Sequence, residues 1–235
     1  MVVGLAFVAV VVSTLFAQAM LVRFTAAHQP QHRAWAIALA MFALASVALA
    51  TGVSTGWDNG TFRVFYLLGA VLNVPWLAMG TLYLFVAAVT ARRALWGLAV
   101  FSGFAAGVVL SAPMQAVHGT AIPVGKDVFG ALPRILAAAG SGVAATVIVV
   151  GAVVSTVRFA RDPRLPYRGR LAGANALIAL GTLILASGGL VQGVVGHDEA
   201  FALSLALGIT VIYVGFTLAS GTRSQSLSVV NSHGA

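Results

Sequence analysis

The sequence has no cysteine and very few charged residues. The absence of cysteine excludes disulfide bonds, thiolate metal ligands and cysteine nucleophiles. Only 8% of the residues are charged and 60% are hydrophobic, whereas about 25% of the residues of an average soluble domain are charged. The mean hydropathy is +1.01. These values exclude a water-soluble globular fold.

Lysine and acidic residues are scarce in a way that excludes several cofactors. Lys126 is the single lysine, and it lies in a short link, so the last apolar run offers no amine for retinal. The apolar runs contain no carboxylate of the kind that ion-coupled pumps use. They also contain no histidine that could bind haem iron. We therefore predict neither retinal nor haem.

What the sequence does contain is seven long apolar runs. A helix needs about 20 residues to cross the hydrocarbon core of a bilayer. The predicted spans cover residues 2–22, 34–53, 62–90, 94–113, 132–157, 171–195 and 200–221. The predicted fold is an all-α polytopic membrane protein, with a seven-helix transmembrane domain over residues 1–221 and a short, polar, disordered cytoplasmic tail over 222–235.

The basic residues predict an orientation, because arginine and lysine in short links stay in the cytoplasm. Ten arginines lie in alternate links and in the tail, and only Arg63, Lys126 and Arg134 lie on the opposite side. We therefore expect a plasma-membrane protein with its N-terminus outside and its C-terminus inside, and no nucleic-acid partner. Seven inner arginines are expected to contact anionic lipid headgroups: Arg92, Arg93, Arg158, Arg161, Arg164, Arg168 and Arg170.

Three outer links share a Gly-x-Asp sequence followed within a few residues by Phe: GWDNGTF, GKDVF and GHDEAF. Asp58, Asp127 and Asp198 in these links are predicted to cap the helices that follow. On the inner side, the triplet VRF occurs at 22–24 and again at 157–159. The spacing fits three tandem helical hairpins followed by a lone helix. Helix capping and orientation alone would also produce much of this pattern, and both interpretations stay open.

The third apolar run is interrupted by Asn73 and Pro75, about 15 Å from its outer end at 1.5 Å per residue. Proline lacks an amide hydrogen and clashes with the carbonyl four residues earlier, here Val71, so the helix is expected to kink. In hydrocarbon the freed groups need partners from other helices, water or a ligand. The predicted partners at the right depth are Ser102 and Ser141, with Asn175 and Gln18 further in and Gln115 and Gln192 further out.

This interruption has two interpretations. It is either a packing kink or a binding point at mid-membrane, where transporters hold their solutes. The second predicts a ligand site in a cavity that opens to the outer face, formed by Asn73, Pro75, Trp76, Tyr83 and Asn175.

Histidines and carboxylates in the outer links suggest one metal hypothesis. His118, His197 and Asp198 are ordinary ligands for zinc or a related divalent ion. A metal there could activate water for hydrolysis at the membrane surface. The spacing matches no tight ligand motif, and solvated link residues explain the same pattern.

The stretch RVFYLLGAVLNVPWLAMGTLYLF, residues 63–85, resembles a segment of uncharacterised seven-span integral membrane proteins of high-GC Gram-positive bacteria. That family has no assigned activity, so the resemblance implies only the fold. The leading hypothesis is a non-enzymatic role, in which the protein binds or moves a small apolar or zwitterionic solute or a lipid. The alternatives are a membrane subunit that packs against a partner or a second copy, and a metal-dependent membrane hydrolase.

Overall fold

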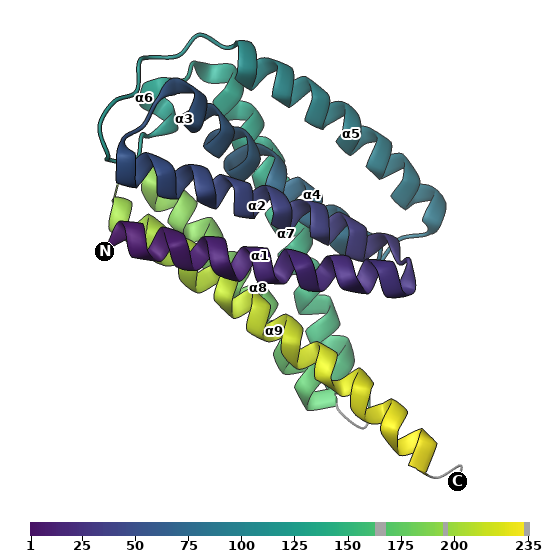
Figure 1. Cartoon of the computed structure of the whole chain (residues 1–235). Coiled ribbons are helices and arrows are strands. Elements are labelled where there is room, and N and C mark those ends of the chain that lie inside the picture. Colours follow the sequence, from purple (N-terminus) through teal and green to yellow (C-terminus); the bar gives the residue numbers. More distant parts are fainter. Residues whose placement is uncertain (163–167, 195–196, 233–235) are drawn as a thin grey trace.

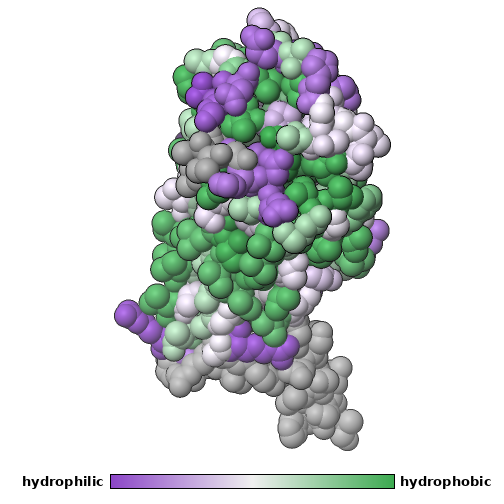
Figure 2. Space-filling model, turned by 90° about the vertical axis from the view of Figure 1, so that its left-hand side faces the viewer, coloured by the Kyte–Doolittle hydropathy of each residue, from purple (hydrophilic) through white to green (hydrophobic). Residues whose placement is uncertain are grey.

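The computed structural model describes residues 1–162, 168–194 and 197–232, and these are helical apart from short links (Figure 1). Seven of the described helices are long and apolar enough to cross a membrane. The predicted all-α, seven-span fold is therefore confirmed. Figure 2 views the molecule from the left-hand side of Figure 1, where the Asp58-containing links lie, and shows hydrophobic residues over much of the surface, with hydrophilic residues gathered mostly in its upper half.

Each span is one continuous helix except the third, which is built from three elements. Along the chain the elements are α1 (Val2–Ala27), α2 (Pro30–Thr55), α3 (Asn59–Phe65), the π-helix η1 (Tyr66–Leu72), α4 (Asn73–Leu82), α5 (Ala88–Ser111), α6 (Gly125–Val128), α7 (Ala131–Arg161), α8 (Arg168–Val194) and α9 (Asp198–Ser232). Together α3, η1 and α4 form the third span, Asn59–Leu82. The four-residue helix α6 lies in the link before α7.

The turn between α1 and α2 illustrates how local chemistry sets these boundaries. His28 has a positive φ of 50°, and its amide donates to the carbonyl of Phe24, so α1 ends there. Pro30 then occupies the first turn of α2, where a residue without an amide hydrogen is tolerated.

Two predicted boundaries are wrong. The third span ends at Leu82 instead of residue 90, because the amides of Leu84 and Phe85 bond to carbonyls three residues back and the chain turns before α5. The residues of this turn are still apolar, so hydropathy does not mark it. At the C-terminus, α9 continues to Ser232, so residues 222–232, which were predicted to be disordered, are helical. The apolar part of α9 ends at Ala219.

The links gather at two ends of the helix bundle (Figure 1). One end, which we call the Asp58 end, contains the N-terminus and residues 56–58, 112–130 and 197. The other, which we call the Arg92 end, contains residues 28–29, 83–87 and 162.

An aromatic cluster forms the core of the Asp58 end. Phe62 stacks on Phe129 with ring centroids 5.7 Å apart, and Phe65 meets Phe201 edge-on at 6.2 Å. Trp57 and Tyr66 complete the cluster. Such ring pairs contribute about 0.5–1.5 kcal/mol beyond the area they bury. The phenylalanines of all three Gly-x-Asp sequences therefore meet in one core.

Helix α5 packs less closely than its neighbours. Its buried residues are only Ala91, Ala105 and Val109, and Trp96 and Val100 are 70% and 72% exposed. In Figure 1, α5 runs along the edge of the bundle, whereas α1 packs along α2, and α7 along α8. The second of the three predicted hairpins thus differs in packing from the other two.

Candidate functional site

The interruption of the third span contains a π-helix as well as a proline. The amide of Asn73 donates to the carbonyl of Leu68, five residues earlier. Pro75 lies in α4 and has no amide hydrogen, so it cannot donate to a carbonyl of the preceding turn. The Ser141 hydroxyl on α7 donates to the carbonyl of Ala70, at the end of the π-helix before this proline, at 2.6 Å. Ser141, one of the predicted partners, therefore contacts the interrupted segment.

Two further hydrogen bonds connect the segment after Pro75 to neighbouring helices. The indole nitrogen of Trp76 donates to the Ser102 hydroxyl on α5 at 3.1 Å, so the second predicted serine also contacts this segment. The indole nitrogen of Trp35 on α2 donates to the carbonyl of Leu77 at 3.2 Å. Sequence reasoning missed Trp35, because only the three-dimensional packing places the start of α2 beside α4.

Of the five residues predicted to form a ligand site, Asn73, Pro75 and Trp76 share the first turn of α4, and the other two lie elsewhere in the chain. Asn73 is 8% exposed, and its side chain makes no hydrogen bond within the described part of the chain. Tyr83 follows the last residue of α4 at the Arg92 end. The side chain of Asn175 donates to the carbonyl of Leu171 in its own helix. None of the five lines either cavity described below, so a ligand site at Asn73 stays a prediction.

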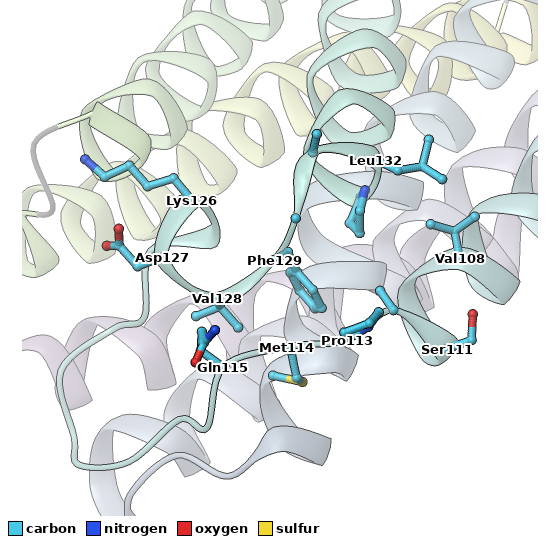
Figure 3. A pocket seen from close by; sticks show the side chains of 14 residues that line it. Val108, Ser111, Pro113, Met114, Gln115, Lys126, Asp127, Val128, Phe129 and Leu132 are labelled. Atoms are coloured by element: carbon cyan, nitrogen blue, oxygen red, sulfur yellow. The ribbon is translucent and has the colours of Figure 1, made fainter.

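A pocket of about 680 Å³ lies at the Asp58 end, between the end of α5 and the start of α7 (Figure 3). We call it the α5–α7 pocket. Its walls are Val108 and Ser111 on α5, the link 112–115, residues 126–130, and Ala131–Pro133 of α7. Figure 3 shows Lys126 and Asp127 at one side and Val108 and Leu132 at the other. The pocket therefore has charged residues at one side and, apart from the Ser111 hydroxyl, apolar residues at the other.

Arg63 on α3 holds two walls of this pocket in place. Its guanidinium donates to the carbonyls of Val109 and Ala112, the latter at 2.8 Å. It also lies over the ring of Phe129, 5.9 Å from the centroid. The amide that would bond to Val109 in a continued helix belongs to position 113, which is a proline. Arg63 thus supplies the donors that the end of α5 lacks.

The link before α6 is attached to three other parts of the Asp58 end. The amide of Val117 donates to the Asn59 side chain at 3.1 Å, and the amide of Ile122 donates to the Asp198 carboxylate at 2.8 Å. The amide of Trp57 donates to the carbonyl of Gly119 at 2.8 Å. The buried side chains of Val117 and Ile122 join the aromatic cluster. This link therefore covers the end of the bundle.

The aspartates of the three Gly-x-Asp sequences have three different environments. Asp58 is the N-cap of α3 and accepts hydrogen bonds from the amides of Gly60 and Thr61. The Thr61 hydroxyl also donates to it, and this bond is the largest of the effects that lower the pKa of the carboxyl from its usual 3.8.

The other two aspartates differ from the capping prediction. Asp127 lies within α6, and the N-cap of α7 is Gly130. Asp198 is the first residue of α9, and its carboxylate accepts from Ile122 and from the side chain of Gln192. The extra helix α6 and these contacts between segments, which the sequence pattern does not reveal, account for the difference.

The residues of the metal hypothesis do not gather in the described part of the chain. Within residues 1–162, 168–194 and 197–232 there is no group of three His, Asp or Glu side chains that could hold an ion. His118 and His197 are exposed at the Asp58 end, and Asp198 bonds to Ile122 and Gln192. A metal site stays a prediction.

The arginines expected to contact lipid lie at the Arg92 end as far as they are described. Arg92 and Arg93 begin α5, Arg158 and Arg161 end α7, and all four are exposed. Arg170 is exposed in the first turn of α8, which begins at Arg168. Arg164 and the side chain of Arg168 lie outside the described residues.

No protein-family model matches the chain, and no curated protein matches it. The geometry of the chain itself therefore supplies the evidence for a function.

Proposed function

We propose that this multi-pass membrane protein binds an amphiphilic molecule, a lipid or a lipid-like zwitterionic solute, in the α5–α7 pocket. The single observation that carries the proposal is the polarity of that pocket, with Lys126 and Asp127 at one side and Val108 and Leu132 at the other. The proposal keeps the ligand class expected from the sequence and moves its site from Asn73 to the Asp58 end.

The position of the pocket supports an amphiphile. Its apolar wall is formed by the last turns of α5 and the first turns of α7, which are membrane spans, and its charged wall is formed by the link outside those spans. A chain of hydrocarbon beside Leu132 would remain at the depth of the bilayer, with its polar group beside Lys126 and Asp127. The volume of about 680 Å³ lies within the roughly 300–1,000 Å³ typical of ligand sites.

The contact between α5 and α7 favours a pocket over an open channel. About two turns below the pocket, Phe101 of α5 lies against Gly140 of α7, so closely that a Cβ atom at Gly140 would be 2.8 Å from the ring. At this depth the two helices are in contact. Binding is therefore better supported than movement across the membrane.

The test is native mass spectrometry after extraction from bilayers of equal parts phosphatidylcholine and phosphatidylglycerol. We expect one retained lipid, lost in Ala131→Trp, which fills the pocket from the first residue of α7. Ala160→Trp is the matched control, because Ala160 is exposed in the same helix and lies outside the pocket. Equal retention in both variants would assign the lipid to another surface and refute the proposal.

A second candidate, a subunit that packs against another membrane protein or a second copy, has one observation in its favour. Gly103 and Gly107 on α5 are four residues apart, and a Cβ atom on either would meet nothing within 4 Å. Small residues at this spacing allow helices to approach closely in membranes.

The two candidates are separable by oligomeric state. Gly107→Leu should dissociate a complex formed through α5, measured by native mass spectrometry or by co-purification of differently tagged copies. Gly142→Leu on α7 is the control, because that glycine also faces open space but lies on a different helix. A particle of the same mass in wild type and both variants would exclude an interface at Gly107.

A further inference from the structure

A second cavity lies where six helices meet, in the half of the protein toward the Arg92 end. It has a volume of about 70 Å³. The lining comes from α1, α2, α4, α7, α8 and α9, and every lining side chain is buried or half-buried. The lining residues that carry the argument are Trp35, Leu77, Thr81, Ile148, Thr182 and Phe216. The cavity is separate from the α5–α7 pocket, and no residue lines both.

The lining offers a ligand few hydrogen bonds. Its only polar side chains are those of Trp35, Thr81 and Thr182. The Trp35 indole donates to the carbonyl of Leu77, and the Thr182 hydroxyl donates to the carbonyl of Ile178 in its own helix. A buried water needs two to four polar partners, and cavities lined by apolar groups stay dry. The chemistry of the walls thus disfavours water and favours hydrocarbon.

The size of the cavity limits the occupant. A cavity of about 150 Å³ lined by Leu, Ile and Phe binds benzene or xenon in another protein, and the present cavity is about half as large. It can therefore hold a group of two or three carbon atoms, or one xenon atom. A tightly packed interior leaves such space unfilled only at a cost of lost dispersion contacts.

We propose that this six-helix cavity binds a small, wholly apolar group. The group comes either from a free apolar molecule or from the terminal carbons of a lipid acyl chain. This proposal does not depend on the proposed function, because the two sites share no residue.

Crystals grown in a lipid phase and pressurised with xenon test it. A xenon peak between Trp35 and Ile148 supports binding of a free apolar molecule. Acyl-chain density at the same place in unpressurised crystals supports the lipid source. A cavity that holds water, or that stays empty under xenon pressure, overturns the proposal.

Two variants connect the result to the cavity itself. Thr182→Leu fills it and should abolish the xenon peak, whereas Thr210→Leu should not. Thr210 is the matched control because its hydroxyl also donates to a carbonyl of its own helix, that of Ala206, and it does not line the cavity. If Thr182→Leu does not fold, Ile148→Ala enlarges the cavity and should strengthen the peak. An unchanged peak in Ile148→Ala would contradict the assignment.

Discussion

Ser141 on α7 donates a hydrogen bond to the carbonyl of Ala70 at 2.6 Å, five residues before Pro75 in the third span. At the Asp58 end, Arg63 donates to the carbonyl of Val109, whose helical donor would be the amide of position 113, a proline. In both places a side chain from another helix donates to a backbone carbonyl near a proline. An apolar interior provides no water for such carbonyls, so these hydrogen bonds tie two helices together.

Ser141→Ala should lower the free energy of unfolding by about 1 kcal/mol, because it removes a partly buried hydrogen bond between α7 and the third span. Unfolding in mixed micelles at increasing denaturing detergent measures this. Thr146→Ala is the control, since Thr146 is exposed and its hydroxyl bonds only to its own helix.

Arg63→Ala should lower the free energy of unfolding by about 2 kcal/mol, because hydrogen bonds from a charged donor contribute about 1.5–3 kcal/mol and Arg63 is half-buried. Hydrogen exchange at residues 109–112 should rise in the same variant. Arg93→Ala, an exposed arginine of α5 at the Arg92 end, serves as the control for loss of charge. Unchanged exchange at these residues would contradict the role given to Arg63.

The stability of α3 should depend on pH, because the Asp58 carboxylate caps this helix. Folding lowers the pKa of this carboxyl below its usual 3.8. The contribution of the carboxylate is therefore complete above pH 3.8, and it is lost as the pH falls through the lowered value. Asp58→Asn should reduce the fall in unfolding temperature between about pH 5 and pH 3, a range around the usual pKa of an aspartate. An unchanged pH dependence in Asp58→Asn would contradict this prediction.

The orientation predicted from the arginines is directly measurable because the chain has no cysteine of its own. Thr120→Cys is exposed at the Asp58 end, and Ala160→Cys is exposed near the Arg92 end. With intact cells and a membrane-impermeant maleimide, we expect labelling at position 120 alone, and labelling at 160 only after permeabilisation. The reverse pattern would place the N-terminus inside.

The seven spans follow from the sequence because crossing a bilayer requires a length and composition that few other structures need. The depths of Ser102 and Ser141 were also readable, since position along a helix gives depth. The π-helix before Asn73 could not be predicted, because hydrogen bonds to the fifth residue back instead of the fourth leave no sign in the composition. The α5–α7 pocket could not be predicted either. It depends on how closely α5 packs against α7, and the composition of the two helices does not determine that distance.

The aromatic cluster at the Asp58 end also has a consequence for how the protein is made. Phe62 belongs to the third span, Phe129 precedes the fifth and Phe201 lies in the seventh. During synthesis the ribosome releases these segments one after another, so the cluster is complete only when the last span has entered the membrane. Until then Phe62 and Phe129 can stack on each other, but Phe201 is missing from the cluster. Truncation before α9 should therefore leave an incompletely assembled protein, a substrate for the quality-control proteases of the cell.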